Sequence, residues 1–282
     1  MDQYFKDKYM PDILIIEPKK GWIPVNFREI WKFRELLYFL AWRDVKVKYK
    51  QTAIGVIWAI IQPLLAMLIF SVLFGRFAGM PSDGTPYPVF VYIGLLPWNY
   101  FATVLGQSTN SVVGGSNLIS KIYFPRLIIP ASTAIAALLD FLIASVLLGF
   151  MMVYYSINLS AGILLVPFLI IITMMNALGF GLWFSALNVK YRDVQYAIPF
   201  LVQIWMFATP VIYPTSLIGD KYGWLLMLNP MGGVIEAFRP AVLGHMPIPW
   251  ISLGISTAVG FAVFVGGMFY FRSVERYFAD VI

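Results

Sequence analysis

The sequence contains no cysteine and only one histidine, His245. The absence of cysteine excludes disulfide bonds, thiolate catalysis and every cysteine-ligated metal site. One histidine cannot build a zinc site, which needs three or four protein ligands. The glycine-rich loop that commonly cradles the phosphates of ATP is also missing. No pair of carboxylates shares an apolar region, as acid/base hydrolysis would require. We therefore expect no catalytic residue, no metal and no cofactor bound by this chain.

Charged residues are scarce, and most of the basic ones are clustered. Only 12% of the 282 residues are charged and 60% are hydrophobic, whereas a soluble domain carries about 25% charged residues. Of the 20 Lys and Arg residues, 11 precede Gln51, where seven acidic residues accompany them. Such a mixed cluster fits an anionic membrane surface or a protein partner better than nucleic acid. The composition indicates an integral membrane protein, and we expect no nucleic-acid partner.

The N-terminal region predicts a polar lead followed by an amphipathic helix. Residues 1–25 are polar and rich in proline, and we expect an irregular cytoplasmic segment without a cleaved signal peptide. Asn26 and Glu29 have the spacing of a capping box, which predicts a helix over residues 26–45. At 100° per residue its charged side chains gather mostly opposite its apolar ones, as in helices that lie in the membrane interface. The alternative is an ordinary surface helix of a soluble domain.

Apolar stretches between residues 52 and 271 predict a bundle of six transmembrane helices of about 20 residues each. We expect the spans at about 52–74 and 86–113, one on each side of the polar segment 154–162 within the uncharged stretch 141–189, and then at 195–213 and 250–271. Residues 214–249 contain two apolar pieces that are too short to cross a bilayer, and they predict short re-entrant or surface helices in the last outer loop. With both termini cytoplasmic, 17 of the 20 basic residues face the cytoplasm, as the positive-inside rule requires. The predicted fold is one all-α integral membrane domain.

Two features inside the predicted spans suggest chemistry. Asp140 is the only ionisable residue deep within a span, so it either marks a functional path or packs as a protonated, hydrogen-bonded acid, and both readings stay open. Aromatic residues make up 17% of the chain, and many fit the interfacial belt of any membrane protein. The more specific interpretation is a path of aromatic rings for a sugar polymer. The candidates for this path are Trp58, Trp98, Tyr100, Phe101 and Trp205, with Asp140 as a further member.

Five segments together resemble the permease subunits of bacterial ABC transporters that export cell-surface polysaccharides, the O-antigen and teichoic-acid class. They are Leu36–Leu65, Pro97–Phe101, Asn117–Pro130, Val189–Val194 and Leu228–Met231. None is specific alone, but their order and spacing around the predicted spans resemble this superfamily over residues 27–282. The segments are less specific for the substrate.

The resemblance implies a permease homodimer in the bacterial cytoplasmic (inner) membrane with two separately encoded ATPase subunits, which hold the ATP and Mg. The substrate of that class is a lipid-linked polysaccharide moved from the inner to the outer leaflet. The amphipathic helix and the loop between the second and third spans would contact the ATPases, and the helices at 214–249 would cap the exit. The residues expected at the ATPase contact are Arg28, Lys32, Asn117, Lys121, Tyr123, Phe124 and Arg126.

Other functions remain open at this point. A permease of the same fold could move drugs or other lipids, because few intramembrane charges and many aromatics favour a sugar-like cargo only weakly. A membrane glycosyltransferase or acyltransferase would need acidic or histidine residues clustered on one membrane face, and the sequence has only scattered ones. A receptor or assembly scaffold would need a sizeable sensory domain, and we find none.

Overall fold

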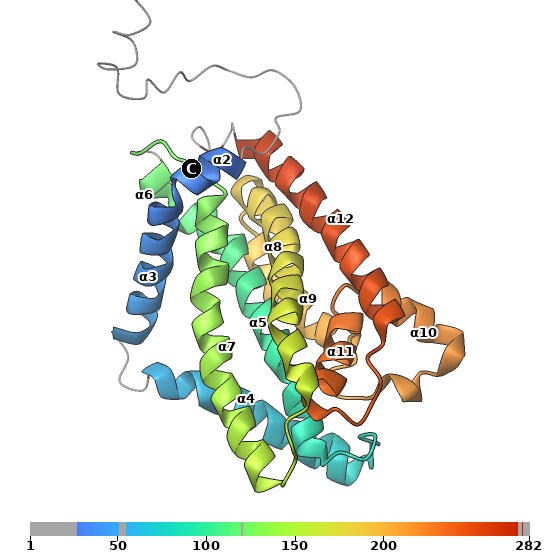
Figure 1. Ribbon diagram of the computed structural model, residues 1–282. Helices are drawn as coiled ribbons and strands as arrows, with labels where there is room; N and C mark the ends of the chain where they lie inside the picture. The colour runs from blue at the N-terminus through green and yellow to red at the C-terminus, as the bar shows by residue number, and fades with distance from the viewer. Residues whose placement is uncertain (1–26, 51–54, 120, 276–277, 279–282) are drawn as a thin grey trace, which may run out of the picture.

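The chain is all-helical, and its long helices run side by side (Figure 1). This computed structural model describes residues 27–50, 55–119, 121–275 and 278, and no strand occurs among them. The helical segments that are long and apolar enough to cross a membrane are Gly55–Phe77, Tyr87–Gly114, Ile128–Tyr154, Ala161–Lys190 and Trp250–Val274. These segments confirm the prediction of a multi-span helical membrane protein, while the count of six spans stays a prediction.

The N-terminal helix is divided in two. Helices α2 (Phe27–Lys32) and α3 (Arg34–Lys50) stand where one helix was expected, and α3 runs on through the basic residues before the first span. Leu40 and Ala41 of α3 are buried, but Tyr38 and Phe39 are exposed, so its apolar residues do not share one face. Figure 1 shows α3 beside α7 (Ile128–Tyr154). The predicted lead at residues 1–25 lies outside the described residues, and the position of α3 in the membrane interface stays a prediction.

Helix α5 (Tyr87–Gly114) is the centre of the bundle. Of the residues in its apolar stretch 78% are buried, against 11–33% in the other long apolar helices. Helices α7, α8 (Val166–Lys190) and α9 (Val194–Phe207) all pack on it. The polar break predicted at 154–162 is found, because α7 ends at Tyr154 and the short 3-10 helix η2 (Ala161–Leu165) precedes α8. The core therefore surrounds one long helix that carries no charged residue.

Two of the predicted spans depart from the expected geometry. Helix α4 (Gly55–Phe70), continued by the π-helix η1 (Ser71–Phe77), lies at a steep angle to α5 and α7 in Figure 1 and leaves most of its apolar surface exposed. Helix α9 ends at Phe207 although the apolar pattern continues to Tyr213, and its 14 residues cover only about 21 Å at 1.5 Å per residue. A turn follows, because Pro210 and Pro214 cannot supply the N–H groups that a continuing helix needs.

Helices α8 and α12 (Trp250–Val274) pack closely because glycines face their interface. A Cβ atom at Gly260 would lie 1.6 Å from Oδ1 of Asn176, which is far inside van der Waals contact. The same amide donates through Nδ2 to the carbonyl of Pro230 at 2.7 Å. Asn176 thus packs against α12 at Gly260 and is hydrogen-bonded to the segment that leads into α11.

The last outer segment forms short helices, as the broken apolar pattern predicts. They are η3 (Thr215–Leu217), α10 (Gly219–Leu228) and α11 (Gly232–Leu243). The 10 and 12 residues of α10 and α11 are too few to cross a hydrocarbon core of about 30 Å. All residues of α11 except Glu236 are buried, and the helix packs against α5, α8 and α12. It is therefore inserted into the bundle, in the half far from α2 (Figure 1), and its expected place at the exit stays a prediction.

One end of the bundle carries a cluster of basic residues. Helix α2, the short helix α6 (Ser116–Ile119), the end of α8 and the end of α12 lie together there (Figure 1). We call it the basic end, with Arg28, Lys32, Lys121, Arg126, Lys190, Arg192 and Arg272 as its described basic residues. The turn between α7 and η2 lies at the opposite end. By the positive-inside rule, the basic end should face the cytoplasm.

This orientation can be tested with single introduced cysteines, because the native chain has none. We expect Lys121→Cys and Lys190→Cys to resist an impermeant maleimide added to intact cells, and to react once the cells are opened. Leu159→Cys, in the exposed turn at the opposite end, should react from outside and serves as the positive control. Labelling of position 121 or 190 from outside would contradict the predicted topology.

Candidate functional site

The loop between α6 and α7 is held in place by two side chains that were expected to bind an ATPase. Phe124 is buried in a hydrophobic cluster that includes Leu40 of α3 and Phe271 of α12. The backbone N–H of Arg126 donates to Oε1 of Glu275 at 3.2 Å, and its guanidinium donates to the backbone carbonyl of the same residue. The guanidinium also lies 5.7 Å from the ring centroid of Phe278. Both residues therefore anchor the loop within the protomer.

The middle of this loop is the part that projects outward. Lys121, Ile122 and Tyr123 are exposed, with 56% of Ile122 and 54% of Tyr123 accessible, and we call these three residues the loop patch. They line, with Phe124 and Arg126, a hollow of about 250 Å³. Partial burial raises the pKa of the Tyr123 hydroxyl, and the charges of Glu29 and Glu275 raise it further. Like any tyrosine hydroxyl, this group is protonated at neutral pH and can donate a hydrogen bond.

The other residues predicted for the ATPase contact lie at the same end. Arg28 and Lys32 are exposed on α2, and Asn117 is exposed on α6. The structure thus brings the predicted set together at the basic end, although it gives Phe124 and Arg126 internal partners. The sequence analysis did not identify Ile122, because nothing in the local sequence around Lys121 and Tyr123 indicates that this isoleucine is exposed. The contact with an ATPase stays a prediction.

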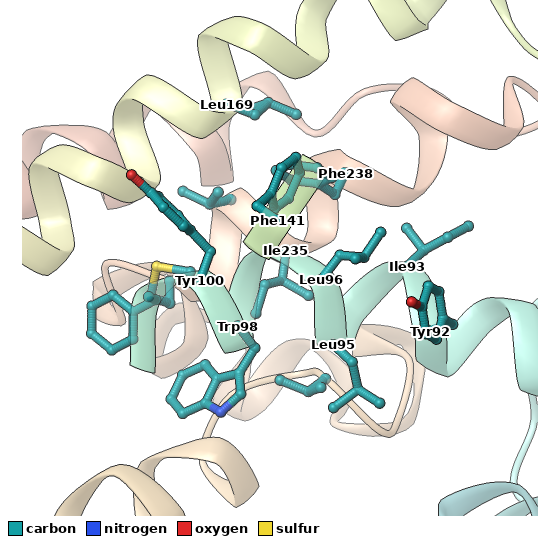
Figure 2. Packing of buried hydrophobic residues seen from close by; sticks show 14 of the residues in the cluster. Tyr92, Ile93, Leu95, Leu96, Trp98, Tyr100, Phe141, Leu169, Ile235 and Phe238 are labelled. Carbon is teal, nitrogen blue, oxygen red and sulfur yellow. The ribbon is translucent and has the colours of Figure 1, made fainter. Parts of the chain in front are cut away.

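The aromatic residues of the predicted sugar path lie in the middle of α5 and not at its end. Trp98, Tyr100 and Phe101 are 2%, 3% and 0% exposed, and Figure 2 shows the rings of Trp98 and Tyr100 leaving α5 in different directions. The ring of Trp205 packs edge-on against Phe101 at 5.1 Å and against Phe180 at 4.8 Å. The rings of Trp98, Phe101 and Trp205 fill the core between α5, α8 and α9.

The remaining path candidates are separated from this cluster. The hydroxyl of Tyr100 donates to the carbonyl of Ala134 at 3.0 Å and its ring lies 5.9 Å from Phe141, both on α7. Trp58 is 56% exposed on α4. The structure therefore joins Trp98, Phe101 and Trp205 in one cluster and places Tyr100 and Trp58 elsewhere. The sequence could not separate these residues, because it shows which residues are aromatic but not the side of the helix on which each ring lies.

Asp140 on α7 has two partners from α3. Its carboxylate forms a salt bridge with the ammonium group of Lys48 and accepts a hydrogen bond from the hydroxyl of Tyr49. Asp140 therefore joins α7 to α3, and its place in a cargo path stays a prediction. The sequence did not suggest this pairing, because Lys48 was assigned to a basic segment that precedes the first span.

Removal of the Asp140 charge should loosen α3 from α7. The side chains of Lys48 and Asp140 are 45% and 20% exposed, so we expect Asp140→Asn to lower stability by about 1 kcal/mol or less, as for other accessible pairs. Proteolysis between α3 and α4 in purified protein would measure the loosening. Asp44→Asn is the matched control, because Asp44 pairs only with its neighbour Arg43 among the described residues. Equal proteolysis rates in both variants would show that the pair does not hold α3.

Arg239 on α11 is a buried cation whose role the sequence did not reveal. Its Nη2 donates to the carbonyls of Pro210 at 2.7 Å and Val211 at 2.9 Å, and the guanidinium carbon lies 3.7 Å from the ring centroid of Phe90. These carbonyls belong to the turn that follows α9, where the backbone lacks the hydrogen bonds of a regular helix. Arg239 therefore supplies the donors that irregular backbone requires inside a membrane protein. The only indication of this role in the sequence was the presence of an arginine within a short apolar segment.

Comparisons with known proteins agree over most of the chain. The family model described as ABC-2 type transporter matches residues 35–243. The O-antigen export system permease protein RfbA of Myxococcus xanthus is 30% identical over 220 residues, which cover 77% of this chain and 84% of that protein. The protein of the same name from Klebsiella pneumoniae is 28% identical over 250 residues, or 88% and 95% of the two chains. The polysialic acid transport protein KpsM of Escherichia coli is 28% identical over 222 residues, or 76% and 82%.

Proposed function

The chain belongs to the ABC-2 type transporter family, and from this premise we propose that it is the transmembrane subunit of an ATP-driven exporter of lipid-linked polysaccharide in the bacterial cytoplasmic membrane. The observation that carries the proposal is the similarity, over 76–88% of the chain, to proteins named for O-antigen export and polysialic acid transport. The all-helical bundle, with its several membrane-length helices, agrees with a permease role.

The energy for transport must come from a partner, because the family's members are membrane subunits and this sequence has no ATP-binding loop. We propose two ABC ATPase subunits, which carry the ATP and Mg, bound at the basic end. The loop patch supports this placement, since it exposes an aromatic and an aliphatic side chain beside a lysine. Arg28 and Lys32 of α2 extend the same surface with positive charge.

We further propose that two copies of this chain form the permease. Apart from Ile198, α9 has no buried residue, and its Phe200 and Ile204 are exposed, as is most of the apolar surface of α4. Interfaces between permanent partners are more hydrophobic than ordinary protein surfaces, so α4 and α9 offer suitable contacts for a second copy. Of the predicted path aromatics, Trp58 is exposed enough to meet cargo, whereas the rings buried around α5 support the helix from within.

Deletion of the gene in the native bacterium tests the proposal directly. We expect surface polysaccharide to disappear and lipid-linked glycan to accumulate inside the cell, and we expect a plasmid copy to restore both. The tagged chain should also purify from membranes together with an ATPase subunit. Normal surface polysaccharide in the deletion strain would contradict the proposal, and a change in drug sensitivity or lipid content alone would favour a permease of the same fold with a different cargo.

A further inference from the structure

One face of α5 is left uncovered by the other helices. Phe180 of α8 packs behind α5 against Phe101, Ala134 of α7 covers one flank through Tyr100, and Trp205 of α9 covers the other through Trp98. The exposed or half-exposed residues of the stretch 99–114 are Asn99, Ala102, Thr103, Gly106, Gln107, Asn110, Ser111, Val113 and Gly114. At 100° per residue, all of these except Ser111 fall within an arc of about 140°.

The chemistry of this face differs from that of the other uncovered surfaces. Its longest side chains are three amides, which with Thr103 we call the amide strip: Asn99, Thr103, Gln107 and Asn110. The exposed large side chains of α7, in contrast, include Ile135, Leu142, Val146 and Phe150, as expected of a surface that meets lipid. Amides placed in hydrocarbon without hydrogen-bond partners are unfavourable. The amide strip therefore faces water or a polar ligand.

Most of the hydrogen-bonding capacity of the strip is available. Asn110 is partly used, because its Oδ1 accepts from Nδ2 of Asn188 and its own Nδ2 donates to the carbonyl of Gly106, both at 3.2 Å. The side chains of Asn99, Thr103 and Gln107 have no hydrogen bond within the part of the chain that the structure describes. Each amide offers two donors and an acceptor, and the threonine hydroxyl offers both kinds of group.

We infer that the amide strip is the surface along which the hydroxyl groups of the glycan chain bind during export, an inference that rests on the proposed function. A sugar hydroxyl is both donor and acceptor, and an uncharged amide matches either role without the strong hold of an ion pair. From Asn99 to Asn110 the strip is about 16 Å long at 1.5 Å per residue, so a polymer can exchange one contact for the next. Neutral hydroxyl-rich chains are the ligand class that this surface fits.

A second copy of the chain is the competing occupant, since amides can also join membrane helices to one another. The apolar surfaces of α4 and α9 suit a permanent interface better than a polar strip does. The two occupants respond differently to added bulk, and Gly106 lies within the strip. A Cβ atom there meets nothing within 4 Å, so a side chain can begin at this position without a clash, and a leucine would extend from it into the space in front of the strip.

The test compares Gly106→Leu with Gly149→Leu in the deletion strain. Gly149 is also free of neighbours within 4 Å, but it lies on the apolar surface of α7 beside Val146 and Phe150. We expect Gly106→Leu to reduce surface polysaccharide by about tenfold and Gly149→Leu to leave it unchanged, with equal membrane abundance and equal dimer cross-linking. The double variant Asn99→Leu with Gln107→Leu should show a similar loss, equivalent to about 1.4 kcal/mol. Exchange of the amides, as Asn99→Gln with Gln107→Asn, should preserve export.

The outcomes separate this inference from the function on which it rests. If the deletion strain itself keeps its surface polysaccharide, the proposed function fails and the inference fails with it. If deletion removes the polysaccharide but Gly106→Leu and the double leucine variant export normally, only the amide strip is assigned wrongly. A fall in dimer cross-linking in Gly106→Leu would assign the strip to the interface between copies and would also overturn the inference.

Discussion

Replacing Arg239 with methionine is expected to unfold the half of the bundle that contains α11. The substitution keeps the volume but removes both hydrogen bonds to the turn after α9, so the carbonyls of Pro210 and Val211 remain buried without donors. Hydrogen bonds to charged groups contribute about 1.5–3 kcal/mol each, so the two together should contribute about 3–6 kcal/mol. We expect a large fall in the thermal unfolding midpoint of the purified protein and little accumulation in membranes.

Two companion variants make this result interpretable. Arg239→Lys keeps the charge but loses the planar contact with the ring of Phe90, so its stability should be intermediate. Arg76→Met removes an exposed arginine at the end of η1 and should behave as wild type. A wild-type midpoint for Arg239→Met would show that the turn after α9 does not depend on this guanidinium.

The second large effect is expected for the double variant Ile122→Ala with Tyr123→Ala, which shortens the aliphatic and the aromatic side chain of the loop patch and leaves Lys121 in place. Truncation of a central interface residue commonly costs about 2 kcal/mol or more, which is roughly a 30-fold loss of affinity. We expect the ATPase subunit to be lost during purification of the double variant, and surface polysaccharide to fall with it. Membrane abundance should stay normal, because neither side chain is buried.

Phe124→Ala supplies the contrast, since this ring is 4% exposed within the cluster that joins α3, α7 and α12. Loss of a buried phenylalanine ring costs about 3–5 kcal/mol of stability, so this variant should fail in folding and accumulation. Arg76→Ala, which removes an exposed basic residue of η1 outside the basic end, should retain the ATPase. Full complex formation by the double variant would contradict the assignment of the loop patch.

The sequence predicted the parts of the fold that depend on local composition. Long uncharged runs identified the membrane helices, and the polar residues 154–162 placed the division between α7 and α8 correctly. The short helices at 214–249 followed from their broken apolar pattern, although the burial of α11 did not. These features could be predicted because hydropathy and helix-breaking residues act within a few positions of the chain.

Features that depend on distant contacts could not be predicted in the same way. Lys48 and Asp140 are 92 positions apart, and no local pattern indicates that they meet. The aromatic residues of α5 illustrate the same limit, because the sequence shows that Phe101 is aromatic but not that Phe180 and Trp205 enclose it. The amide strip lay within the same helix and could have been found by plotting residues 99–114 at 100° each.

The link between Arg126 and Glu275 has a mechanical consequence. It fastens the loop patch to one end of α12, whose 25 residues form a rod of about 37 Å at 1.5 Å per residue. At the far end of that rod the hydroxyl of Ser252 donates to Glu236 of α11 at 2.8 Å. Helix α12 therefore connects the loop patch directly to the inserted helix, and spin labels at Tyr123 and Trp250 should keep a fixed separation whether or not the ATPase subunits are bound.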